Sequence, residues 1–226
     1  MKEIVIGIAA ARKYDNYQRW ILESGAKIIK LGYTENNFDK VIQCSGIVLT
    51  GGEDVHPKFY GKPEYESEFE LDTPDEQRDE FELKILEYTQ KHSIPLLGIC
   101  RGLQIANVYF GGTLIPDILS VGKPDHSKLK EGHDRYHSIS INSKSLLNKI
   151  TGLEKGEVNS AHHQCIDVVG KGLVVCAKSE DGIPEAAERV VGNTFLMLVQ
   201  WHPERMRDPN SPLTKNIRDQ FIKECR

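Results

Sequence analysis

The sequence predicts an α/β fold with a doubly wound, mostly parallel sheet flanked by helices and additional antiparallel strands in the C-terminal half. Short apolar runs alternate with helical patterns through the first hundred residues, as in parallel strands joined by helical crossovers. One run ends in a sharp strand-to-helix turn around Cys100. Beyond Gly112, short alternating runs separated by turn residues favour antiparallel pairing.

The first half carries the elements of a parallel sheet in order. Apolar runs predict strands at residues 4–8, 26–31, 46–49 and 94–99, and the patterns between them predict helices at residues 17–24 and 37–44. A longer helix is expected to begin at Thr73, because Thr73 and Glu76 have capping-box spacing with Pro74 at the first helical position. Its interior carries Phe81 and Ile85 at helical spacing.

The second half has shorter elements. Residues 116–136 are polar and rich in charge, which predicts a loop. Strands are expected at residues 137–141, 174–177, 186–191 and 195–199, with turns at Asp181-Gly182 and Gly192-Asn193. Residues 211–225 are expected to form a closing helix, and residues 1–226 to form a single catalytic domain.

Composition and charge narrow the class of protein. Hydrophobic residues are 39% and charged residues 27%, which allows a substantial core and argues against disorder. A net charge of −4 without a basic stripe argues against nucleic acid. We expect no signal peptide and no membrane span, because no apolar run is long enough. Five cysteines at irregular spacing predict no disulfide framework, and hence a cytoplasmic protein.

Cys100 lies at the sharp turn, between Gly98 and Gly102. A strand that turns directly into a helix strains the turn residue and needs small neighbours. The helix N-terminus puts unpaired N–H groups and a partial positive charge beside the sulfur, which favours the thiolate. The backbone N–H of Arg101 is therefore a candidate oxyanion donor, and Gly51 or Gly52 is the candidate for a second.

His202 and Glu204 follow a later apolar run and are two residues apart. In an extended segment such residues point to the same side, so the carboxylate could orient the imidazole. We predict Cys100 as nucleophile, His202 as base and Glu204 as its orienting acid. The alternative is a buried free cysteine beside an unrelated histidine, which the glycines around Cys100 argue against.

These segments resemble the class I glutamine amidotransferase-like proteins, and within them the stand-alone gamma-glutamyl hydrolase branch, peptidase family C26, which includes gamma-glutamyl-gamma-aminobutyrate hydrolase. The matches run in the family's order through residues 49–57, 78–79, 95–104, 107, 111–112, 159–164, 181–182, 185–186 and 200–204. The resemblance implies a flavodoxin-like fold, a triad of Cys100, His202 and Glu204, and an oxyanion hole from Gly52 and Arg101. It also implies a gamma-glutamyl pocket lined by Gln104, Asn159, Ser160, His162 and His163. Pro184 stands where the family more often has an aliphatic residue, which bears on the local strand pairing.

The other candidate sites are weaker. His133 and His137 are four residues apart, but residues 138–141 alternate as a strand, so this pair shares no helical face and we predict neither a metal nor a cofactor. His162 or His163 either faces the substrate or is a hydrogen-bonded structural histidine. Arg78-Asp79 is either an exposed ion pair or, as we favour, a structural or pocket-rim pair. The remaining cysteines are interpreted as packing or terminal residues: Cys44, Cys165, Cys176 and Cys225.

We expect hydrolysis of the gamma-glutamyl amide bond of a small gamma-glutamyl amine or peptide through a gamma-glutamyl thioester on Cys100. The alternative enzyme is a glutaminase subunit that supplies ammonia to a partner synthase. The alternative outside enzymes is a non-catalytic binding or regulatory protein on the same fold. We expect a small-molecule substrate and no obligatory synthase partner, since no acceptor domain is present in the sequence; a homo-oligomer is compatible with it.

Overall fold

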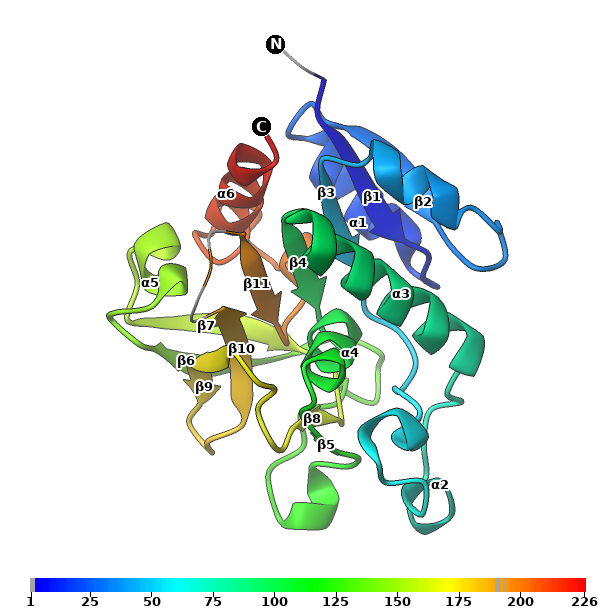
Figure 1. Ribbon diagram of the computed structural model, residues 1–226. Helices are drawn as coiled ribbons and strands as arrows, with labels where there is room; N and C mark the ends of the chain where they lie inside the picture. Colours follow the sequence, from blue (N-terminus) through cyan, green and yellow to red (C-terminus); the bar gives the residue numbers. More distant parts are fainter. Residues whose placement is uncertain (1–2, 190–191, 193) are drawn as a thin grey trace.

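Within residues 3–189, 192 and 194–226, which the computed structural model describes, the strands form a nine-stranded sheet of order β2-β1-β3-β4-β11-β10-β9-β6-β7 (Figure 1). A separate antiparallel pair is formed by β5 and β8. The strands are β1 (Val5–Ala9), β2 (Lys27–Leu31), β3 (Gly46–Leu49), β4 (Leu96–Ile99), β5 (Leu114–Ile115), β6 (Arg135–Ile141), β7 (Lys155–Ser160), β8 (Cys165–Ile166), β9 (Leu173–Ser179), β10 (Pro184–Arg189) and β11 (Leu196–Val199).

The large sheet changes direction at β11. The strands from β2 to β11 in the sheet order run parallel to one another. From β10 outward each strand is antiparallel to its neighbour. The predicted parallel sheet with antiparallel strands in the C-terminal half is confirmed. The C-terminal ends of β1, β3, β4 and β11 therefore lie along one edge, where doubly wound folds place their sites.

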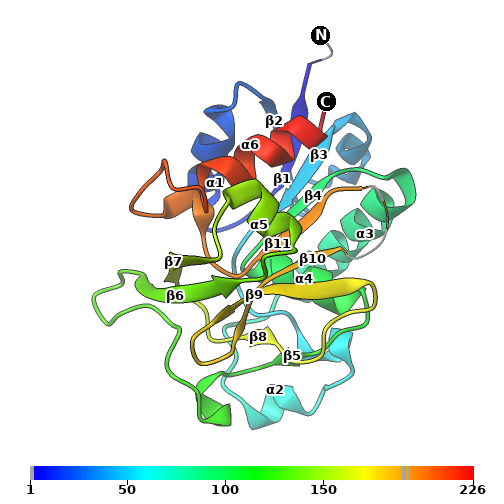
Figure 2. The same cartoon turned by 90° about the vertical axis from the view of Figure 1, so that its left-hand side faces the viewer.

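Helices cover both faces of the sheet (Figure 2). One face packs against α1 (Tyr14–Leu22), α5 (Leu146–Thr151) and α6 (Lys215–Glu224), and the other against α3 (Glu76–His92) and α4 (Arg101–Tyr109). In strand β3 the side chains alternate between the two faces. Val48 packs in the core on the α1 side, and Ile47 and Leu49 pack in the core on the α3 side. This period of two is the one expected of a strand buried on both faces.

The start of α3 differs from the prediction. The helix begins at Glu76, and its cap is Asp75, whose carboxylate accepts the N–H of Arg78 at 3.1 Å and the hydroxyl of Tyr33 at 2.6 Å. Thr73 has a φ of 35° and lies before the helix. The prediction of a cap at Thr73 was therefore wrong. Asp75, two residues later, caps the helix instead, because aspartate caps at least as well as threonine and here also binds Tyr33.

Several other elements differ from the sequence prediction in type or in bounds, or were not predicted. Residues 37–44, predicted as a helix, form the 3-10 helix η1 (Phe38–Gln43). The loop predicted at residues 116–136 contains the short η3 (Leu119–Val121), and β6 begins inside its last two residues. Neither α5 nor the strands β5, β7 and β8 were predicted, and the short α2 (Tyr65–Glu68) lies in an acidic stretch. Residues 190–191 of the strand predicted at 186–191, and Asn193 of the predicted turn, lie outside the described residues.

Strand β10 is irregular where Pro184 was expected to disturb pairing. Its register with β9 shifts between Pro184 and Ala186 and again between Ala186 and Ala187, so Glu185 has no partner on β9. Proline lacks the N–H that a regular ladder needs, and a bulge redirects the side chain within it. Among the described helices, none is long and apolar enough to cross a membrane.

Candidate active site

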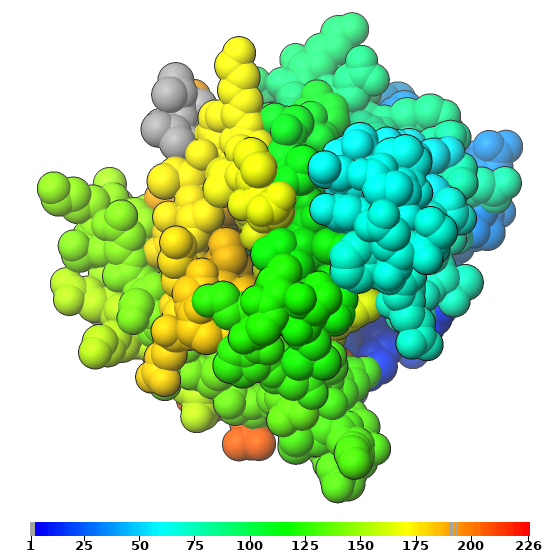
Figure 3. Space-filling view, turned by 90° about the horizontal axis from the view of Figure 1, so that it is seen from below, coloured from blue at the N-terminus to red at the C-terminus, as the bar shows by residue number. Residues whose placement is uncertain are grey.

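A cavity of about 230 Å³ opens at the C-terminal edge of the parallel strands. Its lining includes Cys100, His202 and Glu204 together with Gly51 and Gly52. Figure 3 looks at the molecule from this edge: the cyan segment before α3 and the green segment after α4 lie side by side, with dark blue atoms of the N-terminal part visible between them. Residues more than a hundred positions apart thus meet in one place.

Cys100 occupies the turn between β4 and α4 with φ 54° and ψ −105°. Such a conformation costs a non-glycine residue about 1–3 kcal/mol and persists only where its surroundings impose it. A Cβ on Gly98 would lie 2.7 Å from the carbonyl oxygen of Gly102, and a Cβ on Gly102 would collide with the carbonyl of Leu49. The two glycines therefore let the strained turn pack tightly, as the sequence predicted.

His202 and Glu204 form a buried hydrogen-bonded pair. Nδ1 of His202 lies 2.9 Å from Oε1 of Glu204, and both side chains are more than nine-tenths buried. The sequence predicted an extended segment here. Glu204 instead lies in the short 3-10 helix η4 (Pro203–Arg205), so its carboxylate reaches the ring through a turn. Burial lowers the pKa of His202, but the Glu204 carboxylate and the Cys100 sulfur beside the ring outweigh it and raise the pKa to about 9.

Two further residues hold this histidine. The side-chain oxygen of Asn159 accepts the backbone N–H of His202 at 2.9 Å. The hydroxyl of Tyr17 lies 3.4 Å from Nδ1 of His202 and accepts the N–H of Gly51 at 2.9 Å. Sequence reasoning missed Tyr17, because one tyrosine in the first helix carries no motif. The available signal was its place shortly after the first strand, at the same sheet edge as Cys100, where the structure buries its side chain.

The oxyanion donors are constrained by this arrangement. The N–H of Gly51 is taken by Tyr17, which leaves Gly52 of the two glycines considered from sequence. In the described part of the chain, the N–H groups of Gly52 and Arg101 donate to no protein acceptor. For Arg101 this follows from its place at the first position of α4. Both donors border the cavity or its cysteine, and their role in holding an oxyanion stays a prediction.

A buried ion network fixes the loop that carries Gly52. Arg78 donates to Glu82 at 2.8 Å, to Glu53 at 2.7 Å and to the carbonyl of Gly51 at 3.1 Å. The side chain of Arg101 binds Glu82 and Asp79 on the other side. Arg78 and Asp79 are 7% and 0% exposed, so the structural role favoured for this pair holds and the exposed ion pair does not.

The five residues expected to line the substrate pocket fall into different environments. Gln104 is buried and donates to the carbonyl of Gln164 and the side-chain oxygen of Gln200. Asn159 and Ser160 are fully buried; Asn159 holds His202, and the Ser160 hydroxyl donates to the carbonyl of His126. His162 is buried, with Nδ1 3.0 Å from the carbonyl of Gln164. His163 is part-exposed, with Nε2 2.9 Å from Asp54. Direct contact of these side chains with substrate stays a prediction.

Several cationic side chains line the cavity, and they were not predicted from the sequence. Its lining includes Arg12, Lys13, Lys128 and Arg205, beside the carboxylates of Asp72 and Glu204. Contact with Lys128, burial and the charge of Arg205 lower the pKa of Lys13 to about 8. Arg12 and Lys13 follow the end of β1 after two alanines, so the sheet-edge rule that located Cys100 would have found them too. Cations held this close together favour an anionic ligand.

Comparisons with known proteins agree with this arrangement. The peptidase C26 family model matches residues 5–204. The chain belongs to the peptidase C26 family. It is 34% identical to a glutamine amidotransferase-like protein of Rickettsia prowazekii, over 85% of this chain and 82% of that protein. It is 30% identical to the gamma-glutamyl-gamma-aminobutyrate hydrolase of Escherichia coli K12, over 81% of this chain and 72% of that protein.

The fold is shared more widely. A Thermoplasma acidophilum structure assigned to GMP synthase superposes with a TM-score of 0.71 at 17% identity, covering 100% of this chain and 95% of that one. At this identity the likeness concerns the fold alone. Membership of the peptidase C26 family makes the protein an amide hydrolase of the glutamine amidotransferase-like kind.

Proposed function

We propose that the protein hydrolyses the gamma-glutamyl amide bond of a small gamma-glutamyl amine or peptide, with Cys100, His202 and Glu204 as its catalytic triad. The observation that carries this proposal is the strained Cys100 turn beside a buried, glutamate-paired His202. A thiol, a base and an orienting carboxylate in this order are the parts of nucleophilic acyl transfer. The similarity to gamma-glutamyl-gamma-aminobutyrate hydrolase supports the choice of acyl group.

The chemistry follows from the positions of these groups. His202 takes the proton of the Cys100 thiol, and the thiolate attacks the gamma-carbonyl carbon of the substrate. The resulting oxyanion accepts hydrogen bonds from the backbone N–H groups of Gly52 and Arg101. The C–N bond then breaks as the leaving amine takes the proton from His202, and a gamma-glutamyl thioester remains. His202 next deprotonates a water that attacks the thioester, and glutamate leaves as the thiol regains its proton.

The charge around the cavity supports an acidic substrate. A gamma-glutamyl group carries an α-carboxylate, and the cations that border the cavity include Arg12, Lys13 and Lys128. The nearby Asp72 offers a partner for the α-ammonium group. We therefore propose that the zwitterionic end of the substrate binds between these groups, with Gln104, Ser160, His162 and His163 as further candidate contacts and Asn159 acting through His202.

The enzyme is proposed to act as one domain and without an obligatory synthase partner. Its cavity is lined by Cys100, His202 and Gly52, and among the described residues the N–H groups of Gly52 and of Arg101, next to Cys100, have no acceptor. A reducing, cytoplasmic setting suits a thiol enzyme, and the five cysteines here are buried and free. A glutaminase subunit that supplies ammonia to a partner is the alternative that has to be separated by experiment.

The experiment is a substrate panel with purified protein alone. We expect kcat/KM for several gamma-glutamyl amines to exceed that for free glutamine at least tenfold, with glutamate and the amine identified by mass. The Cys100→Ala variant serves as the blank for contaminating activity. Equal or better use of glutamine, or activity only after a cellular partner is added, would support the glutaminase subunit. Binding of these compounds without turnover would support a non-catalytic protein.

A further inference from the structure

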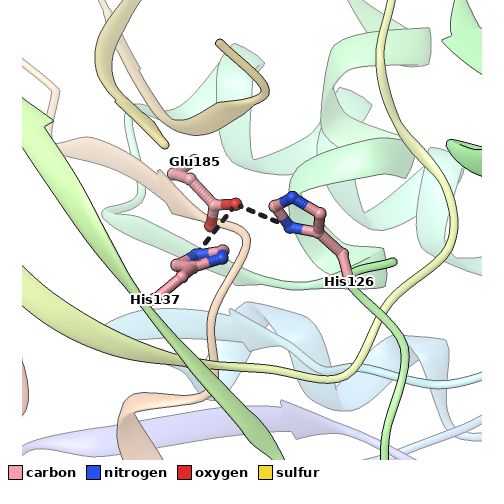
Figure 4. Close-up of side chains that lie close together, drawn as sticks. All are labelled: His126, His137 and Glu185. Carbon is pink, nitrogen blue, oxygen red and sulfur yellow. Dashed lines mark ion pairs between the residues drawn. The ribbon is translucent and has the colours of Figure 1, made fainter. Parts of the chain in front are cut away.

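Beyond the cavity, a second buried cluster brings together His126, His137, His162 and Glu185; we call it the histidine cluster. Oε1 of Glu185 lies 3.5 Å from Nδ1 of His126, 3.3 Å from Nε2 of His137 and 3.6 Å from Nε2 of His162. Figure 4 shows the two rings of His126 and His137 turned toward the carboxylate. The ligand atoms of His126, His137 and Glu185 all lie within 4.8 Å of one another, and His162 approaches the same carboxylate oxygen from a fourth segment of the chain.

Each of the three nitrogens is within ion-pair distance of Oε1 of Glu185, yet none of the four atoms makes a hydrogen bond among the residues that the structure describes. Glu185 is fully buried, and His126 and His162 are no more than 5% exposed. Buried polar atoms are nearly always paired, because leaving them unpaired costs about 1–3 kcal/mol each. These atoms form ion pairs but no hydrogen bonds, and this arrangement leaves a place for a bound group between them.

The outer contacts of two histidines turn lone pairs inward. Nδ1 of His162 lies 3.0 Å from the carbonyl oxygen of Gln164, and a carbonyl can only accept, so Nδ1 carries the proton. Nε2 of His126 lies 3.2 Å from a carboxylate oxygen of Asp181 and donates to it in the same way. The inward nitrogens of the neutral rings therefore present lone pairs. A carbonyl or carboxylate behind each imidazole is the usual support of a metal-binding histidine.

We propose that His126, His137, His162 and Glu185 bind one divalent transition-metal ion of the zinc class. Both ring nitrogens of His162 are then occupied, so this role replaces the substrate contact considered for His162 above. A tetrahedral Zn²⁺ with bonds of about 2.0–2.1 Å separates its ligand atoms by about 3.3–3.4 Å. The separations from Oε1 of Glu185, 3.3, 3.5 and 3.6 Å, are close to this spacing. Three imidazoles and one carboxylate suit zinc and its transition-metal neighbours better than Mg²⁺ or Ca²⁺, which prefer oxygen ligands.

The backbone prepares this site from separate elements. Glu185 lies in the bulge of β10, which frees it from strand pairing with β9. His137 lies on β6, His162 follows β7, and His126 lies in the segment before β6. A second cavity, of about 640 Å³, is lined by His126, His137 and Asp181 and gives an ion a route from solvent.

The role that fits these positions is a structural cross-link beside the active site. Lys128 and Ala161 line the catalytic cavity and are within two residues of His126 and His162. The carbonyl of His126 also accepts the N–H of His162 and the hydroxyl of Ser160. An ion would therefore fix the segment before β6 and the turn after β7 to β10. Its removal should loosen one wall of the cavity and raise KM more than it lowers kcat.

The sequence prediction of no metal weighed His133 with His137 and His162 with His163, and neither pair is the site proposed here. The cluster takes one histidine from each pair and adds His126 and Glu185. Its members span 60 positions of the chain, and no short ligand motif links them. His133 is exposed, and His163 contacts Asp54 instead.

The test is metal binding by the full chain, in the Cys100→Ala background so that the active-site thiol cannot serve as a ligand. Chelator-treated protein is titrated with Zn²⁺ and, separately, with Co²⁺. We expect one equivalent bound by elemental analysis and visible absorption bands of tetrahedral Co²⁺. A hundredfold excess of Zn²⁺ over its Kd should raise Tm by about 5–10 °C.

Variants then locate the ion. Glu185→Gln and His137→Ala should lose the Co²⁺ bands and at least tenfold in affinity, whereas the exposed His133→Ala should bind as the parent does. In protein that retains Cys100, chelation should leave kcat within about threefold. Absence of a Tm shift and of Co²⁺ bands in the folded parent would overturn the proposal, even if both variants failed to fold. Binding that both variants retain would overturn it as well, because the ion would then lie elsewhere.

Discussion

In the catalytic cavity Nδ1 of His202 lies 2.9 Å from Oε1 of Glu204, whereas in the histidine cluster three ring nitrogens lie 3.3–3.6 Å from Oε1 of Glu185. The first pair is a hydrogen bond, with the ring's other side toward a strained cysteine. The second set consists of longer ion pairs without hydrogen bonds, at separations close to those of ligands around an ion. We thus propose that the same residue types serve proton transfer in one place and metal binding in the other.

The two sites also occupy different parts of the sheet, which fits the different roles proposed for them. Cys100, His202 and Glu204 lie at the C-terminal edge of parallel strands, where the chain turns and a cavity opens. The histidine cluster lies in the antiparallel extension, among β6, the turn after β7, β10 and the segment before β6. Substitutions that remove a member of one site should therefore change rate, and those in the other should change stability.

The largest expected effect is that of Cys100→Ala. Loss of a triad nucleophile reduces kcat by about 10⁶. An electrophilic glutamine analogue should label Cys100 before the other cysteines, each of which is buried, and steady-state rates with peptide mapping would measure both results. Far-UV circular dichroism should remain that of the parent. Labelling of Cys44 or Cys176 with Cys100 unmodified would sink the assignment.

The glutamates of the two sites give the most direct contrast. Glu204→Gln should reduce kcat by about 10⁴, and His202→Ala should approach the loss seen for Cys100→Ala. Glu185→Gln makes the same chemical change at another buried glutamate. It should leave kcat within about tenfold and instead lower Tm, because it removes a proposed metal ligand. Rates and melting curves on all three proteins would decide. A rate loss for Glu185→Gln as large as that for Glu204→Gln would erase the distinction between the sites.

Gly52→Ala should have an intermediate effect. A Cβ at this position would collide with the guanidinium of Arg78, so either the loop or the ion network must move. Displacement of one oxyanion donor typically costs about 10²–10³ in kcat. The control is Gly25→Ala, where a Cβ would meet no atom within 4 Å, although φ is positive at 78°. That control should cost some stability and no turnover; an equal rate loss in both would exclude a role for the Gly52 N–H.

The pH dependence of stability should follow His202. Its pKa is raised in the fold to about 9 from 6.5, so the stabilisation is fully present below pH 6.5 and is lost as the pH rises through 9. The loss amounts to something on the order of 3 kcal/mol. Denaturant melts between pH 6 and 10 should show this decline in the parent and a much smaller one in His202→Gln. The same slope in both proteins would place the responsible group elsewhere.

The sequence was sufficient for the parts of the fold that depend on local pattern. The strands from β1 to β4 and the turn at Cys100 were predicted because apolar runs, glycines and helix signals lie next to one another. The fold class and the family followed from them. The start of α3 was misplaced because Thr73 and Asp75 are rival caps two residues apart, and only tertiary contact with Tyr33 decides between them.

What could not be predicted depends on contacts between distant segments. The support of His202 by Tyr17 spans 185 positions, and its support by Asn159 spans 43. The histidine cluster depends on a bulge at residues 184–187 that changes the direction of Glu185. No periodicity carries such information, because it is set by how the antiparallel strands pair once the chain has folded.

The smallest effect expected here is that of Tyr17→Phe. The Tyr17 hydroxyl accepts the N–H of Gly51 and lies beside Nδ1 of His202, so its loss leaves a buried donor unpaired and relaxes the ring. We expect a stability loss of about 1–3 kcal/mol. We also expect a decrease in kcat of roughly tenfold, since one of several supports of His202 is removed while Glu204 remains. Denaturant melts and steady-state kinetics measure the two effects.

The matched control for Tyr17→Phe is Tyr60→Phe. Tyr60 is also buried, and within the described residues its hydroxyl has no hydrogen-bond partner. Removing it deletes an unsatisfied polar group, so stability should stay equal or rise and kcat should not change. If both variants behaved alike, the Tyr17 hydroxyl would contribute only packing. His202 would then be held by Glu204 and Asn159 alone, and the catalytic site would depend on fewer long-range supports than the histidine cluster.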